Sequence, residues 1–414
     1  MSNITDRIAN LSPEQRAKLL RRLSEKQGNG SSSIIEPQPR TSPHFPLSFA
    51  QQRLWLIEQL QPGTAAYNIS KAWRLAGSIN VATLKTAVQK IVERHEVLRT
   101  TFSMIDDQPV QVIMPSLDVP IVTIDLSTVD HDDRETTANV VIREEAQRPF
   151  SLEQSPLMRV YVIYLSAEEH ILLLTQHHII TDGWSLDILN DEFSQLYTGL
   201  QEKKAIDLPT LPVQYADYAV WQRQWLQGAT LERHLHYWRE QLQDAAPLDI
   251  PTDFPRPAVQ SYRGGVLPVR FGKDLTAQLT ALSQRTGTTL FVTLMTAWQA
   301  LLARYSGQDD LMVGMGTAGR TRKEIENLIG FFVNTLVIRT QLTTNLTVMD
   351  MLERVRTVVY DAYTYQDLPF EYLVEHLQPE RDLSRHPLVQ IVLVLQNTPK
   401  VQTGAVAAEI DTVS

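Results

Sequence analysis

The sequence predicts an α/β protein built as two lobes, and two observations lead to this. Apolar residues recur at helical spacing in several segments, and short, wholly apolar runs typical of buried strands lie between them. The order helix-then-strand occurs in the first half and again in the second, although no repeat of residue identities is visible. With 414 residues, 43% of them hydrophobic, the chain can fill one large core or two ordinary ones.

Residues 1–26 are expected to form a helical leader. Ser12, Pro13 and Gln15 supply an N-cap, a proline at the first helical position and a capping-box partner. The outer face of this helix is basic, so it is either a solvated amphipathic segment or a docking element for another protein. Residues 27–46 are rich in Gly, Ser and Pro and predict a flexible linker.

The N-terminal lobe is expected over residues 47–205. Ser48 can cap a helix that ends near residue 60, and Asn80 can cap a second helix that leads into residues 94–102, where a strand begins and continues to the next turn. An Asp106-Asp107 turn then predicts a hairpin, and a further hairpin is formed by residues 160–165 and 171–176. A helix over 186–200 closes this lobe.

The C-terminal lobe is expected over residues 206–414. The segment 251–263 is marked by several prolines, is expected to cross between the two lobes, and is a second candidate for the lobe boundary. A helix over 290–305 followed by a strand over 311–314 repeats the order seen in the first half.

Composition excludes several classes of protein. A net charge of -9 without a basic cluster argues against nucleic acid as the main partner. The absence of cysteine excludes disulfides, thiolate metal sites and a cysteine nucleophile. Because the sequence shows no signal-peptide pattern and no run approaching a membrane span, we expect a cytoplasmic protein without a membrane partner.

Two imidazoles, a carboxylate and a glycine come together in the stretch QHHIITDGWS, residues 176–185, directly after the apolar run 171–174. Neighbouring strand residues point to opposite faces, so His177 and His178 cannot serve one reacting atom unless the strand has already ended. We therefore expect one histidine to act and the other to pack. A neutral imidazole can accept a proton from an amine that attacks a carbonyl, because its ordinary pKa of about 6.5 is close to physiological pH. The alternative is a hydrogen-bonded core histidine.

Asp182 and Gly183 come next. Gly183 can adopt a positive φ and would let the chain turn sharply past the site. Asp182 either caps the helix that begins after Ser185 or pairs with an arginine that fixes the loop carrying His178.

Three other kinds of site fit less well. A metal site of His177, His178 and Asp182 is disfavoured by the alternating strand faces and by the lack of a distant His/Cys cluster. A nucleophile elbow of the G-x-S-x-G type and a phosphate-binding glycine loop are both missing from the sequence. A base without its own nucleophile fits direct transfer of an acyl group between two bound substrates.

Seven motifs in a fixed order make the chain similar to the condensation domains of nonribosomal peptide synthetases. They are SFAQQRLW (48–55), RHEVLRTTF (94–102), HHIITDG (177–183), YADYAVW (215–221), IGFFVNT (329–335), QDLPFE (366–371) and RDLSRHPL (381–388). The resemblance covers residues 47–397. It implies two chloramphenicol acetyltransferase-like lobes arranged as a V, with the active site in a central tunnel.

The resemblance also implies roles for individual residues. His178 matches the active histidine, either as general base toward the acceptor amine or as the group that positions it. Asp182 would be structural and form a salt bridge, for which we favour Arg99 over Arg53. Trp221 and Asn334 match positions that shape the site from the second lobe.

The resemblance further implies two substrates. The donor and acceptor thioesters would arrive on the phosphopantetheine arms of an upstream and a downstream peptidyl carrier protein, and the chain itself would bind no cofactor. Because the sequence has no adenylation or carrier signature, we expect these partners in trans. Details of the motifs, such as AAYNI (65–69) and NTL (334–336), resemble the subgroup that joins an L-configured donor to an L-configured acceptor.

Three alternatives stay open. One is a starter condensation domain that attaches a fatty acyl group to an amino acid, and another is an acyltransferase that uses acyl-coenzyme A. The third is a non-catalytic module that only binds carrier proteins. It is favoured by the C-terminal lobe, which looks truncated because family members continue for several tens of residues past the seventh motif.

Overall fold

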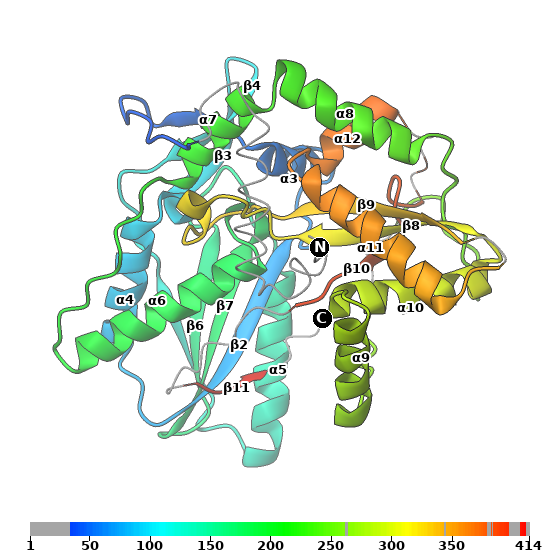
Figure 1. Ribbon diagram of the computed structural model, residues 1–414. Coiled ribbons are helices and arrows are strands. Elements are labelled where there is room, and N and C mark those ends of the chain that lie inside the picture. Colours follow the sequence, from blue (N-terminus) through cyan, green and yellow to red (C-terminus); the bar gives the residue numbers. More distant parts are fainter. Residues whose placement is uncertain are drawn as a thin grey trace.

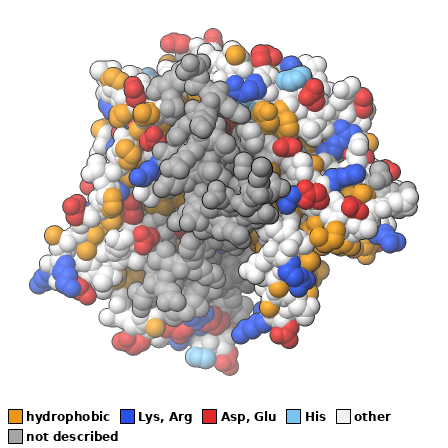
Figure 2. All heavy atoms as spheres, viewed as in Figure 1, with side chains coloured by type: hydrophobic (Ala, Val, Ile, Leu, Met, Phe, Trp, Pro, Cys, Tyr) orange, Lys and Arg blue, Asp and Glu red, His pale blue; other side chains and the backbone are white. Residues whose placement is uncertain are grey.

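The computed structural model describes residues 34–260, 264–342, 345–378, 382 and 384–396, together with the backbone of 406–410. The expected leader over residues 1–26 lies outside these ranges. Two lobes lie side by side, each with its own sheet (Figure 1). On the face shown in Figure 2, basic and acidic side chains are interspersed over both lobes.

The first lobe contains a five-stranded sheet with the strand order β11-β2-β7-β6-β5. Its strands are β2 (Asn68–Ala76), β5 (Ile121–Asp125), β6 (Met158–Tyr164), β7 (Glu169–His177) and β11 (Val406–Ile410). The predicted hairpin of β6 and β7 is confirmed, with Val160 opposite Leu174. Residues 171–174 are all apolar because helices cover both faces of the sheet: Leu172 and Leu174 enter one core, and Ile171 and Leu173 the other.

Helices flank this sheet on both sides (Figure 1). They are α4 (Val81–Arg94) and α6 (Gly183–Gln201) on one face and α5 (His131–Gln147) on the other. Asn80 caps α4 as predicted, since its side chain accepts a hydrogen bond from the backbone N–H of Thr83. The helix predicted over 186–200 is also confirmed, and it begins three residues earlier, at Gly183.

A smaller sheet of three strands, in the order β1-β4-β3, lies beside the first lobe's main sheet. It consists of β1 (His44–Pro46), β3 (Thr100–Ile105) and β4 (Gln108–Ile113). The predicted turn at Asp106 and Asp107 is confirmed, and both residues have positive φ values, 50° and 59°. The 3₁₀ turn η1 (Glu96–Arg99) joins α4 to β3. Ser48 caps the helix α3 (Phe49–Leu60) as predicted, and Gln51 completes a capping box.

The second lobe is built on a sheet with the order β10-β8-β9. Its strands are β8 (Asp310–Thr317), β9 (Asn334–Gln341) and β10 (Val392–Leu393). Its helices are α8 (Gly228–Leu242), α9 (Lys273–Arg285), α10 (Leu290–Ser306), α11 (Val348–Thr364) and α12 (Phe370–Leu377). The predicted helix over 290–305 and strand over 311–314 correspond to α10 and β8.

The lobe boundary predicted at residues 205 and 206 does not coincide with a change of hydrophobic core, and it stays a prediction. The helix α7 (Tyr215–Trp225) packs into the first core, and the second core begins at Leu226. The reason is the aromatic face of α7, because Tyr215, Tyr218 and Trp221 are all buried against the first lobe.

Residues 320–332, which we call the bridging segment, leave the second lobe after β8 and return to it at β9. Their apolar side chains enter the first core, namely Ile325, Leu328, Ile329, Phe331 and Phe332. The 3₁₀ turn η3 (Lys323–Ile325) lies within this segment. The first lobe is therefore completed by residues that are far away in the sequence.

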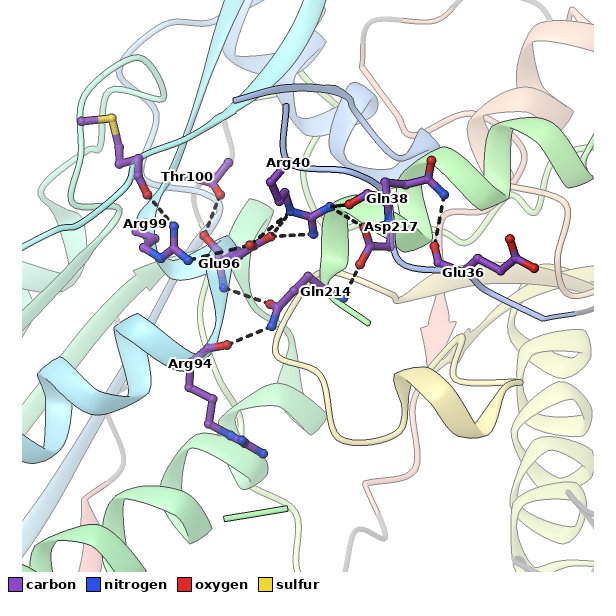
Figure 3. A network of polar contacts seen from close by, with 10 residues as sticks. Glu36, Gln38, Arg40, Arg94, Glu96, Arg99, Thr100, Gln214 and Asp217 are labelled. Carbon is purple, nitrogen blue, oxygen red and sulfur yellow. Dashed lines mark hydrogen bonds and ion pairs between the residues drawn. The ribbon is translucent and has the colours of Figure 1, made fainter. Parts of the chain in front are cut away.

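The predicted linker over residues 27–46 is wrong for its described part, 34–46. Ile35 is buried, and residues 44–46 form β1. Arg40 lies 2.8 Å from a carboxylate oxygen of Glu96 and 2.7 Å from one of Asp217, so it joins η1 to α7 (Figure 3). Composition could not show this, because a single arginine with two carboxylate partners fixes a segment that is otherwise rich in Ser and Pro.

Candidate active site

The histidine pair lies where β7 ends. His177 is the last residue of β7 and is paired with Asn68 of β2, whereas His178 opens the 3₁₀ turn η2 (His178–Ile180). The backbone N–H of His178 donates to the carbonyl oxygen of Tyr67 at 2.8 Å. The strand has thus ended at His178, and the two imidazoles have different surroundings.

His177 packs in the first core. Only 2% of its surface is exposed, and its ring lies 6.4 Å from that of Tyr67 and 6.2 Å from that of Phe150. Its Nδ1 accepts a hydrogen bond from the backbone N–H of Ile179 at 3.1 Å. Burial, helped by the neighbouring His178, lowers the pKa of His177 to about 3. This imidazole is therefore neutral at physiological pH and has a structural role.

His178 is held in one tautomer. Its Nδ1 lies 2.7 Å from the carbonyl oxygen of Thr181, which can only accept, so Nδ1 carries the proton and Nε2 carries the lone pair. The ring is only partly buried and lies 4.6 Å from that of Phe331 in the bridging segment. Burial lowers the pKa of His178 below its ordinary value, opposed by the Thr181 carbonyl and Asp182 and assisted by Arg53. The side chain therefore presents a neutral, basic Nε2 at the junction of the lobes.

Asp182 is fully buried and fastens the site motif to the bridging segment. One carboxylate oxygen accepts from the backbone N–H of Ser185 at 2.7 Å and caps α6, and the other accepts from the backbone N–H of Phe332 at 3.0 Å. The guanidinium of Arg320 donates to the first oxygen at 3.3 Å. Both roles considered for Asp182, helix cap and arginine partner, are therefore present together.

The predicted partner of Asp182, Arg99, is wrong. Arg99 donates to the carbonyl oxygen of Met114 at 2.5 Å, and its guanidinium lies 3.8 Å from the carboxylate of Glu96 (Figure 3). The physical reason is that Arg99 ends η1 on the side of the small sheet, whereas Asp182 faces the bridging segment at the start of α6. The other candidate, Arg53, forms an ion pair with Glu371 at 2.8 Å instead.

Arg320 was not predicted, yet it organises the bridging segment. Its guanidinium donates to the carbonyl oxygens of Ile325 at 2.6 Å and Leu328 at 2.7 Å, and to the hydroxyl of Ser185 at 2.8 Å. Its side chain is 2% exposed, and burial lowers its pKa while Asp182 opposes that shift. The only sequence signal is an arginine that directly follows Gly319 at a strand end, which is too weak to identify it.

The expected role of Gly183 is also wrong. Gly183 is the first residue of α6, and it is not among the residues with positive φ. A Cβ added there would meet no atom within 4 Å, so neither backbone strain nor crowding requires glycine. Gly319 does have that requirement, because its φ is +64° and a Cβ would lie 2.0 Å from the carbonyl oxygen of Phe332.

Trp221 and Asn334 lie beside a small cavity of about 30 Å³ between the lobes, and His178 is not among the residues that line it. The indole of Trp221 stacks on that of Trp225 at 5.3 Å. The amide of Asn334 donates to the carbonyl oxygens of Gln366 at 2.8 Å and Leu368 at 2.7 Å, and so holds the sixth motif against β9. A direct role of these two residues toward a substrate stays a prediction.

Two further properties bear on the kind of site. Within the described ranges, His, Asp and Glu side chains nowhere form a group of three that could hold a metal ion. None of the helices in that part of the chain combines the length and apolar character needed to cross a membrane.

Two lobes joined by a bridging segment, with a tautomer-locked histidine at a strand end, define the class of chloramphenicol acetyltransferase-like folds. The X-domain from teicoplanin biosynthesis superposes with a TM-score of 0.79 at 28% identity, covering 92% of this chain and 83% of that one. The first condensation domain of the calcium-dependent antibiotic synthetase superposes with a TM-score of 0.72 at 20% identity, covering 90% of this chain and 86% of that one, which shows the fold.

The chain belongs to the condensation domain family, whose model matches residues 41–412. It is 46% identical over 376 residues to a linear gramicidin synthase protein of Brevibacillus parabrevis, covering 91% of this chain and 5% of that protein. It is 38% identical over 413 residues to the phosphinothricin tripeptide synthetase PhsC of Streptomyces viridochromogenes, covering 100% of this chain and 38% of that protein. The chain thus spans well under half the length of these relatives.

Proposed function

We propose that the chain forms an amide bond, in the cytoplasm, between a donor thioester and the amine of an acceptor aminoacyl thioester. Each substrate would be carried on the phosphopantetheine arm of a carrier protein. The observation that carries the proposal is the tautomer of His178, whose Nδ1 donates to the Thr181 carbonyl and leaves Nε2 as the acceptor. A base of this kind, with no nucleophile of its own, suits direct transfer between two bound substrates.

In the proposed step, the acceptor nitrogen attacks the donor carbonyl carbon. The new C–N bond forms, the C–S bond of the donor thioester breaks, and the donor arm leaves as a thiol. One proton departs from the attacking nitrogen and one reaches the sulfur. Nε2 of His178 either accepts the proton of the nitrogen or aligns the amine by a hydrogen bond.

The other site residues support this step indirectly. Asp182 and Arg320 hold the bridging segment against the first lobe, and that segment places the Phe331 ring 4.6 Å from the ring of His178. His177 is buried beside the acting residue and keeps the end of β7 in place.

The donor is proposed to be an L-aminoacyl or L-peptidyl group. One similar protein is named as a tripeptide synthetase, which supports an aminoacyl or peptidyl donor. The motif segments 65–69 and 334–336 resemble the subgroup that joins an L-configured donor to an L-configured acceptor, and they support the L configuration. Phosphopantetheine would come with the carrier proteins.

The test is product formation from two loaded carrier proteins, followed by mass spectrometry of the acceptor carrier. With an L-aminoacyl donor, the wild type should yield a dipeptide on the acceptor carrier. The variant His178→Ala should form this dipeptide more slowly, by a factor of about 10² to 10⁴. His131→Ala is the matched control, because that histidine lies on α5 with its side chain 92% exposed.

The other outcomes separate the alternatives. Product only from a fatty acyl donor would favour the starter reaction, and product from an acyl-coenzyme A donor would favour the free acyltransferase. No product from any donor, with carrier binding intact, would favour the non-catalytic module.

A further inference from the structure

A second cavity, unrelated to the histidine site, lies inside the first lobe. Its volume is about 190 Å³, and it lies between the five-stranded sheet and the helices α4 and α6, with one side open to solvent. Protein interiors are close-packed, so a sheet and helices that packed fully against each other would leave no such space. The lining residues include Trp73, Leu84, Leu174, Leu189 and Phe193.

The cavity opens at the end of the lobe that is remote from His178. Exposed residues at its rim include Ala76, which pairs with Glu169 at the far end of β7 from His177, and Gln201, the last residue of α6. With a rise of about 1.5 Å per helical residue, the axis from Gly183 to Gln201 measures roughly 27 Å. A ligand here would therefore not contact the reacting groups.

The chemistry of the walls is apolar and uncharged. Leu84, Met158 and Leu172 are buried in its depth, and the residues that line the cavity include no Asp, Glu, Lys, Arg or His. Aromatic rings form one side, where Phe193 and Tyr197 stack at 5.6 Å. The interior thus suits an apolar ring or a short chain and disfavours a charge, which would lose its hydration without a partner.

Uncharged polar side chains form the outer part of the cavity. They are Ser78, Asn190, Ser194, Thr198 and Gln201. A few convergent polar groups on an otherwise apolar pocket are the usual means of orienting a small ligand. Hydroxyl and amide groups can both donate and accept, so they match a neutral hydrogen-bonding group on the ligand.

The volume sets the size of that ligand. An apolar cavity of about 150 Å³ is large enough to bind benzene. A cavity of about 190 Å³ has room for a substituted ring of similar size.

We propose that this cavity is a binding site for a small neutral amphiphile, with a single apolar ring or a short chain and one uncharged hydrogen-bonding group. The proposal does not depend on the proposed function, because none of its lining residues belongs to the histidine site.

The probe is 4-fluorophenol, observed by ¹⁹F NMR with the full chain, and the comparator is 4-fluorobenzoate, which has the same ring and a charge. Saturable binding of the phenol is expected, with binding of the benzoate weaker by about tenfold or more. Val88→Phe, which places a ring in the cavity from α4, should weaken binding of the phenol by about tenfold or more relative to the wild type.

Two further variants keep the test sharp. Val140→Phe makes the same change on the exposed side of α5, on the other face of the sheet, and should bind the phenol as the wild type does. If Val88→Phe does not fold, Ser194→Trp can block the cavity from the half-buried polar side of α6. The proposal is overturned if the phenol does not saturate, if the folded blocking variant binds it normally, or if the benzoate binds equally well.

Discussion

Replacing Asp182 by alanine should destabilise the protein strongly, because the carboxylate has three partners and none of them can be solvated. Ser185 and Phe332 would lose the acceptors of their backbone N–H groups, and Arg320 would keep a buried charge without its counterion. Removing one partner of a buried ion pair costs about 3 to 5 kcal/mol. The lost helix cap costs about 1 kcal/mol, which is smaller than the spread of the ion-pair value and is not added to it. We expect a loss of about 3 to 5 kcal/mol in the free energy of unfolding.

Urea unfolding followed by far-UV circular dichroism measures this change, with Asp187→Ala as the matched control on the same helix. Among the described residues, Asp187 has no ion-pair or side-chain hydrogen-bond partner, so its replacement should change stability by no more than about 0.5 kcal/mol. The double variant Asp182→Ala with Arg320→Met removes the unpaired charge and should recover at least about 1 kcal/mol relative to the sum of the single changes. A loss below about 1 kcal/mol in Asp182→Ala, or strictly additive effects, would refute the fastening role of this pair.

Three further predictions concern neighbouring features. As the pH falls from about 6.5 to about 3, His177 becomes protonated in the unfolded chain but stays neutral in the folded one, so the free energy of unfolding should fall by up to about 4 to 5 kcal/mol. In urea titrations, His177→Gln should lose less stability than the wild type over the same pH range. Gly183→Ala should leave the thermal midpoint unchanged or raise it, since a Cβ there meets no atom, whereas Gly319→Ala should lower it, since a Cβ there meets a backbone carbonyl; equal midpoints would contradict the account. Arg40→Ala should make residues 34–46 more sensitive to limited proteolysis than a control such as Arg134→Ala, because the segment loses its ion pairs with two carboxylates. Unchanged cleavage would speak against the anchoring role of Arg40.

The local elements of the fold were predictable from the sequence. The Asn80 cap, the Asp106-Asp107 turn and the apolar run before His177 are short-range signals, and each produced the predicted element. We predicted separate surroundings for the two histidines from strand alternation. The structure has separate surroundings, but their cause is the end of β7 at His177, which leaves His178 in η2.

Long-range pairing was not predictable in the same way. Arg320 lies 138 residues from Asp182, and no periodicity connects them. The composition of the first core was missed for a related reason, because the aromatic face of α7 and the bridging segment belong to this core although they come later in the chain than the predicted lobe boundary. The flexible linker was inferred from composition, which carries no information about the two carboxylates that hold Arg40.

The central claim is that neutral His178, with its lone pair on Nε2, assists attack of the acceptor amine. The most direct test is the single-turnover rate of condensation between two loaded carrier proteins, measured against pH for the wild type and for His178→Ala. Protonation of the acceptor amine should slow both proteins as the pH falls, because only the free amine can attack. Since burial lowers the pKa of His178, protonation of its imidazole should add a further loss of rate to the wild type only below about pH 6.5. The variant should be slower by about 10² to 10⁴ at neutral pH and should lack that further loss. A variant that condenses as fast as the wild type, or whose rate shows the same further loss below about pH 6.5, would contradict the account.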